Sequence, residues 1–173
     1  MENIKILISR DRIRGKVAEL AAQVQKDYAD RNPLLIGVLK GSFMFMADLV
    51  RALDMPLEVE FVRLSSYGSA KESSGEVEVI HDVNLTVEGR DVLVVEDIVD
   101  TGLSLRFLLD NLQGRNPSSL RLCTLLDKPS RRKTPVEIDY LGFTIPDKFV
   151  VGYGLDFNER FRNLPDVCYL EDD

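Results

Sequence analysis

A stretch in the middle of the chain, residues 92–104, has the sequence VLVVEDIVDTGLS and concentrates polar chemistry in a few positions. Three carboxylates, Glu96, Asp97 and Asp100, follow an apolar run and are interleaved with or followed by hydroxyl side chains and a glycine. Burying carboxylates is unfavourable unless they are paired or bind something. The cluster therefore predicts a binding site rather than a purely structural turn.

The two halves of this stretch suit two parts of one ligand. Residues 100–104 combine a small glycine, two hydroxyls and the free N–H groups of a helix start, which together can cradle a phosphate dianion. The pair Glu96 and Asp97 would repel phosphate, but it can accept hydrogen bonds from vicinal sugar hydroxyls. A ribose 5-phosphate fits both halves.

Three alternative roles for the stretch compete with a ribose 5-phosphate site. Asp100 or Thr101 could merely cap the following helix. The VVED strand end and the sequence LLDKP at 125–129 are superficially similar to a phosphoacceptor receiver domain, but there the acidic motif would stand near the N-terminus. A P-loop NTPase is disfavoured because no G-x-x-x-x-G-K-[ST] sequence precedes the acids.

The hydrophobic pattern around the stretch alternates helices with strands. Apolar residues recur at helical spacing from Ile13 to Tyr28, after Ser9 and Asp11, which can cap a helix start. The other predicted elements are strand 34–39, a helix from 43 to 50, strand 57–64, a mobile loop at 65–75, strands 76–80 and 91–95, helix 102–112 and strand 118–125, then short strands and loops. This order predicts an α/β fold with a parallel sheet flanked by helices, and ligands then bind at the carboxyl ends of the strands.

Length and composition bound the class of protein. The chain has 173 residues, 45% of them hydrophobic and 29% charged, which predicts a single globular domain. Its formal net charge of −7 argues against general affinity for nucleic acid or anionic lipid, and no apolar run approaches the roughly 20 residues of a membrane span. Cys123 and Cys168 stand in apolar stretches and are expected to be buried reduced thiols, so we expect a cytoplasmic protein.

Several further motifs follow one another along nearly the whole chain. They are LKGS at 39–42, SYG at 66–68, DK at 127–128, PDKFVVGY at 146–153 and LDFNERFRNL at 155–164. Together with these motifs, the stretch 92–104 resembles the phosphoribosyl-pyrophosphate motif of type I phosphoribosyltransferases. Its surroundings resemble the hypoxanthine (hypoxanthine-guanine) phosphoribosyltransferases, a match far more specific than a lone glycine motif.

The resemblance implies an architecture. It is the type I phosphoribosyltransferase fold, an α/β single domain over 1–173 with a central parallel sheet flanked by helices. The family adds a small hood subdomain from the terminal segments, with a C-terminal contribution at about 145–173, and a flexible flap loop at about 65–80. Family members form homodimers or homotetramers, and the peptide bond between Leu39 and Lys40 is cis in the family.

The resemblance also implies a reaction and its participants. Family enzymes transfer ribose 5-phosphate from phosphoribosyl pyrophosphate to hypoxanthine or guanine with the help of Mg2+, giving IMP or GMP and pyrophosphate. The partners implied are these small molecules, with no nucleic acid and no membrane. A flap that closes over the reaction centre would exclude water, which otherwise hydrolyses the activated sugar.

The family's roles fall on matching positions of this sequence. Ribose 5-phosphate binding falls on Glu96, Asp97, Asp100, Thr101, Gly102, Leu103 and Ser104, with Asp100 also the general base toward purine N7. Pyrophosphate binding falls on Lys40, Gly41, Ser66, Tyr67 and Arg162. Purine binding falls on Lys128, Phe149, Val150 and Asp156, where Lys128 donates to the 6-oxo group and Phe149 stacks on the ring. The metal ligands are expected among Asp156, Glu96 and Asp97.

Other interpretations of single features stay open at this point. Lys40 could be an ordinary solvated lysine, Phe149 a core aromatic, and the segment 65–75 a plain hairpin loop. We expect His81 and the basic cluster 131–133 to be solvated, although pyrophosphate or a dimer partner could touch the cluster. The rival function is a regulatory protein of the same fold that binds RNA or DNA and has uracil phosphoribosyltransferase activity.

Overall fold

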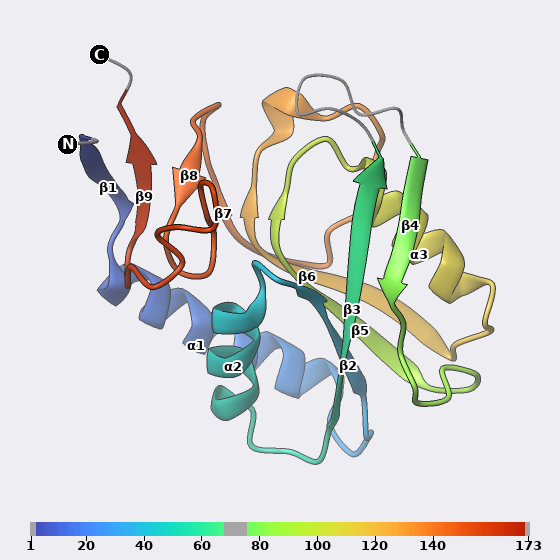
Figure 1. Cartoon of the computed structure of the whole chain (residues 1–173). Helices are drawn as coiled ribbons and strands as arrows, with labels where there is room; N and C mark the ends of the chain where they lie inside the picture. Colours follow the sequence, from blue (N-terminus) through green and yellow to red (C-terminus); the bar gives the residue numbers. More distant parts are fainter. Residues whose placement is uncertain (1–2, 68–75, 172–173) are drawn as a thin grey trace.

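The computed structural model describes residues 3–67 and 76–171, and its main feature is a six-stranded sheet (Figure 1). Its strand order is β4-β3-β2-β5-β6-β7. The strands are β2 (Leu34–Leu39), β3 (Glu58–Tyr67), β4 (Glu76–His81), β5 (Asp91–Val99), β6 (Ser119–Asp127) and β7 (Tyr140–Thr144). All neighbours pair in parallel except β3 and β4, which pair antiparallel at one edge. The predicted parallel sheet is therefore confirmed, with one antiparallel edge strand.

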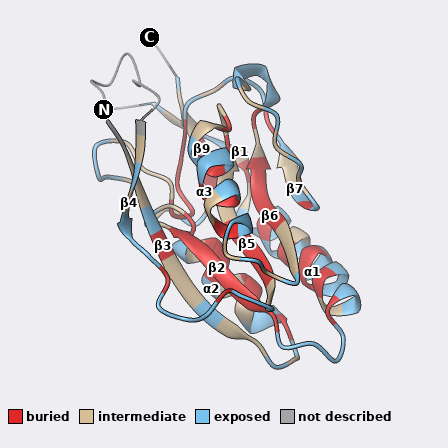
Figure 2. Ribbon diagram, turned by 90° about the vertical axis from the view of Figure 1, so that its right-hand side faces the viewer, coloured by how far each residue is buried: buried red, intermediate tan, exposed pale blue. Residues whose placement is uncertain are grey.

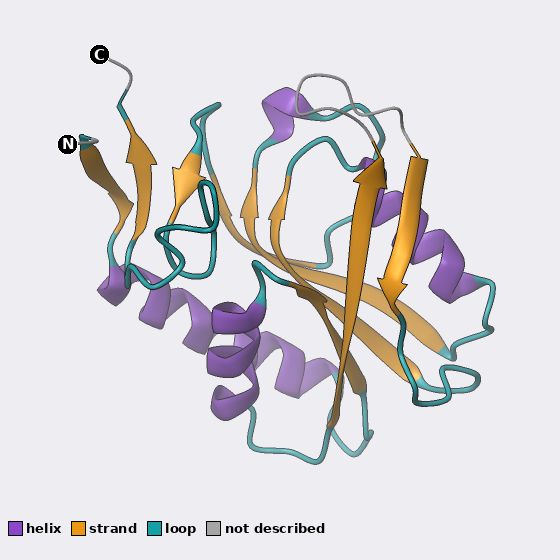
Figure 3. Ribbon diagram, viewed as in Figure 1, coloured by secondary structure: helices purple, strands orange, loops and turns teal. Residues whose placement is uncertain are grey.

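Helices cover both faces of this sheet (Figure 3). One hydrophobic cluster joins the sheet to α1 (Arg10–Asp27) and α2 (Phe43–Ala52), and a second joins its other face to α3 (Leu103–Gln113). Successive residues of β2 are buried in different clusters: Leu35 belongs to the first and Ile36 to the second. Figure 2 shows the resulting buried centre along β2, β5 and β6. Continuous apolar runs are the pattern that such double burial requires.

The first helix begins where the sequence indicates. The side chain of Ser9 occupies the N-cap position and accepts a hydrogen bond of 3.3 Å from the backbone N of Arg12. The helix then buries Ile13, Val17 and other residues of the predicted apolar face. Among the described residues, no helix is long and apolar enough to span a membrane.

A second sheet, which we call the terminal sheet, joins the two ends of the chain. It has three antiparallel strands in the order β1-β9-β8, namely β1 (Ile4–Ile8), β9 (Val167–Leu170) and β8 (Val150–Val151). Ile4 pairs with Leu170, so the described ends of the chain lie side by side (Figure 1). The hood subdomain that the resemblance implies stays a prediction; what the structure shows is this three-stranded sheet. The strand β1 itself is absent from the sequence prediction.

Several strands run further than predicted, and in β3 and β5 the added residues include predicted site residues. β3 continues through Ser66 and Tyr67, because β4 pairs with it there, so the segment expected to be a loop from residue 65 begins later. β5 continues through Glu96 and Asp97 to Val99 instead of ending at Val95, because β6 runs beside it to Asp127. The acidic residues therefore lie partly on a strand end. The rest of the predicted flap, 68–75, lies outside the described residues.

Candidate active site

A cavity of about 530 Å3, which we call the site cavity, opens at the carboxyl ends of β2, β5 and β6. Many predicted site residues line it: Lys40, Gly41, Asp97, Asp100, Lys128, Phe149, Val150, Asp156 and Arg162. Its wall also contains Leu39, Arg63, Leu64, Ile98, Arg131, Leu155 and Glu159. The edge of the sheet predicted from strand order is therefore where residues from distant parts of the chain converge.

The loop after β2 is tightly packed against the strand end that carries the acids. The peptide bond between Leu39 and Lys40 is cis, as the resemblance implies. A Cβ on Gly41 would lie 1.8 Å from Oδ2 of Asp97, and a Cβ on Gly154 would lie 2.3 Å from the carbonyl oxygen of Gly41. Only glycine permits these two close approaches. The carboxylate of Asp97 is thus held directly against the Lys40–Gly41 loop.

The neighbouring acids Glu96 and Asp97 have different surroundings. Desolvation, and then the charge of Asp97, raise the pKa of Glu96 well above its ordinary value. The backbone N of Asp97 donates to Oε1 of Glu96 at 3.1 Å, and the backbone N of Ile98 donates to Oδ1 of Asp97 at 2.8 Å. Asp97 lines the cavity, whereas Glu96 is not among the lining residues. The raised pKa of Glu96 favours its neutral form, which can donate a hydrogen bond as well as accept one.

The turn from β5 into α3 starts the helix at a glycine and leaves the N-cap position without a side chain. Gly102 has a φ of +85° and occupies the N-cap position without a side-chain cap, so helix capping does not account for Asp100. Thr101, Gly102, Leu103 and Ser104 form the turn and the first residues of α3, next to the lining of the cavity. The turn is closed from outside, because the carbonyl of Thr101 accepts hydrogen bonds from the backbone N of Lys133 and Thr134, at 2.8 and 3.1 Å.

The basic cluster 131–133 is partly solvated, as predicted: Arg131 and Lys133 are exposed, whereas Arg132 is half-buried. Arg132 pairs with Asp127 and donates through Nε to the carbonyl of Asp100 at 3.0 Å. Nε of Arg131 lies 3.2 Å from Oδ1 of Asp100, and Arg131 lines the cavity. That oxygen of Asp100 is buried and makes no hydrogen bond with the described part of the chain. The sequence could have indicated that the cluster lies near the site, because the cluster begins three residues after Lys128, a predicted site residue.

The purine end of the predicted site combines a buried cation with an exposed ring. Lys128 is only 5% exposed, and no described residue pairs with its ammonium group. Phe149 is 55% exposed and meets Phe157 edge to face at 5.6 Å, so it is not a core aromatic. Ile98 lines the same cavity and was missed from the sequence, because it has the pattern of an ordinary strand residue. A flat ring with a polar edge would satisfy Lys128 while covering Phe149.

The pyrophosphate end gathers the other cations. Nζ of Lys40 lies 3.0 Å from Oε2 of Glu159, which argues against a simple solvated lysine. Arg162 donates through Nη1 to the carbonyl of Gly154 at 2.8 Å, and its Nη2 lies 3.2 Å from Oδ1 of Asp156. Nε of Arg162 is buried and has no hydrogen-bond partner among the residues described. A buried donor of this kind is expected to find a ligand acceptor.

The carboxylates in the cavity fit a divalent metal that is completed by a substrate. Asp97 and Asp156 both line the cavity and offer hard oxygen ligands. Within residues 3–67 and 76–171, no group of three or more His, Cys, Asp or Glu side chains could hold a metal by itself. This donor set matches Mg2+, which keeps several waters and takes further oxygens from substrate phosphates.

The remaining predicted residues have simpler positions. Ser66 and Tyr67 lie on β3, and their side chains are outside the described structure, so the flap prediction stays a prediction. His81 is exposed on β4, as expected. Cys123 and Cys168 are buried free thiols, also as expected.

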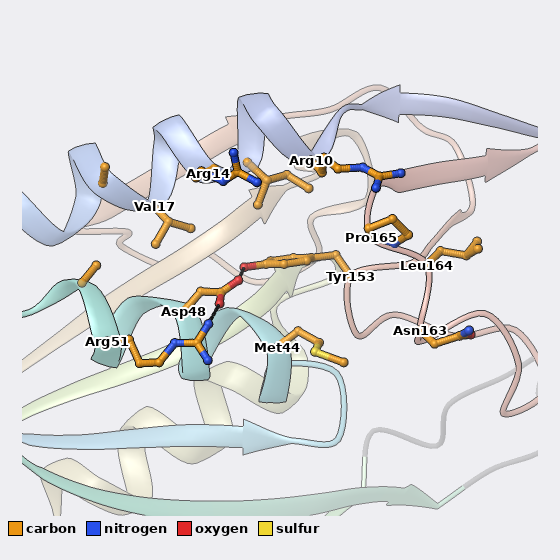
Figure 4. A pocket seen from close by; sticks show the side chains of 13 residues that line it. Arg10, Arg14, Val17, Met44, Asp48, Arg51, Tyr153, Asn163, Leu164 and Pro165 are labelled. Atoms are coloured by element: carbon orange, nitrogen blue, oxygen red, sulfur yellow. Dashed lines mark hydrogen bonds and ion pairs between the residues drawn. The ribbon is translucent and has the colours of Figure 1, made fainter.

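A larger cavity, about 670 Å3, lies between α1, α2 and the segment 153–165, and we call it the helix pocket (Figure 4). Its charged groups already have partners. Asp48 accepts from Tyr153 and pairs with Arg51 at 2.6 Å, as the dashed lines in Figure 4 show. Arg10 pairs with Asp166 at 3.2 Å. The charged groups of the helix pocket therefore have partners, whereas the site cavity also holds Lys128, whose ammonium group has none among the described residues.

Comparison with known proteins identifies a family that matches most of the chain. The model of a family described as phosphoribosyl transferase domain matches residues 8–158. The hypoxanthine-guanine phosphoribosyltransferase of Bacillus subtilis is 51% identical over 167 residues, which cover 96% of this chain and 93% of that protein. The hypoxanthine phosphoribosyltransferase of Haemophilus influenzae is 47% identical over 94% of this chain and 92% of its own.

A solved structure extends the similarity to three dimensions. The crystal structure of a hypoxanthine phosphoribosyltransferase from Staphylococcus aureus matches with a TM-score of 0.93 at 46% identity, covering 96% of this chain and 91% of that one. The family model alone spans well over half of the chain. The chain therefore belongs to the phosphoribosyltransferase family, with its type I α/β fold, and is a transferase enzyme.

Proposed function

We propose that the protein is a purine-salvage enzyme that transfers ribose 5-phosphate from phosphoribosyl pyrophosphate to hypoxanthine, and also to guanine, in a Mg2+-dependent reaction. The products are IMP or GMP and pyrophosphate. The observation that carries the proposal is Lys128, a buried ammonium group without a described partner, in the same cavity as the exposed ring of Phe149. A 6-oxopurine supplies an acceptor for the first and a face for the second.

The part of the site that contains Lys128 and Phe149 orients the purine. The 6-oxo group accepts a hydrogen bond from Lys128, and the purine ring lies against Phe149, with Ile98 on the cavity wall. Stacking of a base on an aromatic ring stabilises binding by roughly 1–3 kcal/mol. The backbone of Val150, which is buried on β8, contributes to recognition of the base edge.

The ribose 5-phosphate end holds the sugar while the bond breaks. The N–H groups at the start of α3 and the hydroxyls of Thr101 and Ser104 receive the 5′-phosphate. Glu96 and Asp97 bind the ribose hydroxyls, one as a donor and one as an acceptor. Lys40, Arg162 and the side chains of Ser66 and Tyr67 bind pyrophosphate, which leaves with the electron pair of its bond to C1′.

The proton balance requires one base. Purine N9 attacks C1′ as the bond from C1′ to pyrophosphate breaks, and the proton on N7 must leave as positive charge develops on the ring. Asp100 accepts it, because its carboxylate lines the cavity. Two arginines hold this residue in place: Nε of Arg131 lies 3.2 Å from Oδ1 of the carboxylate, and Nε of Arg132 donates to the backbone carbonyl.

Bound Mg2+ would neutralise part of the negative charge of the pyrophosphate group. We assign its protein ligands to Asp156 and Asp97, which face the cavity. Glu96 is a poorer ligand than expected from the sequence, because its raised pKa favours the neutral form. We further propose that the chain is a single domain that forms a homodimer or homotetramer in the cytoplasm. Size-exclusion chromatography with light scattering will measure the number of subunits in the assembly.

The first experiment is a spectrophotometric assay with phosphoribosyl pyrophosphate, with and without Mg2+, and five bases in parallel: hypoxanthine, guanine, xanthine, adenine and uracil. Formation of inosinate that depends on Mg2+ is the expected result. Uracil turnover, or none with any base, would favour the regulatory alternative, and binding to RNA or DNA would then be measured. The same assay determines the ratio of hypoxanthine to guanine use.

A further inference from the structure

Glu159 lines the site cavity and has no role in the proposed reaction. Its carboxylate contacts both cations at the pyrophosphate end: Oε2 lies 3.0 Å from Nζ of Lys40, and Oε1 lies 3.4 Å from Nη2 of Arg162. An exposed glutamate is ionised at neutral pH, so both contacts are ion pairs. One carboxylate thus spans the two positive groups that pyrophosphate would need.

From this arrangement we infer that Glu159 is a resident counter-ion, which pyrophosphate must displace from Lys40 and Arg162 and which promotes its release. The inference rests on the proposed function, because it takes the pyrophosphate site as given. A polyanion that enters the cavity meets a carboxylate already paired with its cations, and the two anions repel each other. When the product leaves, the same carboxylate returns to both cations.

The side chain of Glu159 is able to make this movement. It is 66% exposed, so it can turn into water at little desolvation penalty. The backbone beneath it is fixed: its N donates to Oδ2 of Asp156 at 2.8 Å, and Phe157 and Arg160 exchange backbone hydrogen bonds of 3.1 and 3.0 Å around it. Glu159 itself has a φ of +61° within this turn. Displacement therefore needs a side-chain rotation and no change of the loop.

The two cations differ in how far they depend on Glu159. Arg162 keeps the carbonyl of Gly154 and the carboxylate of Asp156 as acceptors when Glu159 moves away. Lys40 has no other acid partner among the described residues. Removal of the carboxylate should therefore leave Arg162 in place, free the charge of Lys40 and remove one of the two carboxylates beside Arg162. The expected result is tighter binding of pyrophosphate, not a collapsed site.

The test is the variant Glu159→Gln, which keeps the shape and removes the charge. Calorimetric titration with inorganic pyrophosphate and Mg2+ should show about threefold to tenfold tighter binding than wild type, the range expected for losing two exposed ion pairs with a competing ligand. Product inhibition by pyrophosphate should strengthen by the same factor. The matched control is Glu19→Gln, which removes one charge from an exposed pair with Lys16 on α1 and should leave pyrophosphate binding unchanged.

Two outcomes would overturn the inference. Unchanged or weaker pyrophosphate binding in Glu159→Gln, with wild-type thermal unfolding, would mean that Glu159 positions the cations instead of competing for them. An equal gain in Glu19→Gln would reduce the effect to net charge. In the background of Lys40→Met the gain should shrink, because the stronger of the two contacts is already gone. If the wild type has no phosphoribosyltransferase activity, the proposed function fails, whereas an active wild type with no gain in the variant contradicts this inference alone.

Discussion

The site cavity and the helix pocket share one segment of chain as a wall and are both lined by arginines and aspartates. Leu155, Asp156 and Arg162 face the site cavity, whereas Tyr153 and Asn163 face the helix pocket. The helix pocket is larger and less polar, and its ion pairs are complete. The site cavity holds a buried lysine without a described partner and buried oxygen and nitrogen atoms without hydrogen bonds.

On the proposed function, the smaller of the two cavities is the one that binds the ligand. Buried polar groups usually have partners in a folded chain, and the charged groups between α1 and α2 do, although the hydroxyl of Tyr28 at the end of α1 is buried without one among the described residues. Buried polar groups without hydrogen bonds lower the stability of the free protein, so several of them in one cavity indicate a ligand that supplies the missing hydrogen-bond partners. The following variants test this contrast, beginning with the largest effect.

Asp100→Asn should lower kcat by about 100- to 10,000-fold, since a general base typically contributes that much. Binding of phosphoribosyl pyrophosphate should stay close to wild type, because the substitution keeps the shape of the turn. Steady-state kinetics and calorimetry on the same preparation measure the two quantities. Unchanged turnover would remove Asp100 from the role of base.

Lys128→Met should separate function from stability at the purine end. We expect a loss of about 10- to 100-fold in kcat/KM for hypoxanthine, the size of one hydrogen bond from a charged donor. The melting temperature should rise, because a buried ammonium group without a described partner is replaced by an apolar side chain of similar length. Equal losses in base and phosphoribosyl pyrophosphate binding would place Lys128 elsewhere in the site.

Glu96→Gln should change how stability depends on pH. Burial and Asp97 raise the folded-state pKa of Glu96 above its ordinary value of 4.5, so the folded wild type binds a proton more tightly than the unfolded chain does. Its stability relative to the variant is therefore full below pH 4.5 and falls as pH rises toward the folded-state pKa, at no more than about 1.4 kcal/mol per pH unit. Chemical denaturation from pH 4 to 8 measures this, and parallel curves for the two proteins would contradict it.

Tyr153→Phe tests the helix pocket and should have the smallest effect. The hydroxyl of Tyr153 donates to Asp48, and its loss should lower the free energy of unfolding by about 1 kcal/mol. Asp48 keeps Arg51 as its partner, and kcat should remain at the wild-type value. Urea unfolding and the activity assay give both numbers. A fall in kcat without loss of stability would make the helix pocket part of the functional machinery.

Local patterns in the sequence predicted the elements whose own residues carry a strong hydrophobic pattern. The strand at 34–39 and the helix after Ser9 lie where their hydrophobic periodicity places them. β1 was missed because it is an edge strand with a partly exposed pattern, including Ile6 at 61%, and its partner β9 is at the other end of the chain. No local signal encodes such a pairing.

The site was predictable where motifs are continuous and not where partners are distant. The motif at 155–164 was recognised, yet only Asp156 and Arg162 received roles from it. Glu159 stands between them, and its contact Lys40 is 119 residues away. Arg131 was missed for the same reason, since its relation to Asp100 arises only when the 131–134 segment folds back over the turn.

The terminal sheet has a consequence for how the protein is made. Phe149 is followed at once by β8, which pairs only with β9, and the backbone N of Leu170 donates to the carbonyl of Phe149 at 3.4 Å. Synthesis proceeds from the N-terminus, so β9 is the last of the described strands to be made. A nascent chain can bury α1 and the central strands early, but it must wait for β9 before the aromatic platform is braced. A chain shortened to end before β9 should therefore lose activity while much of the core still folds.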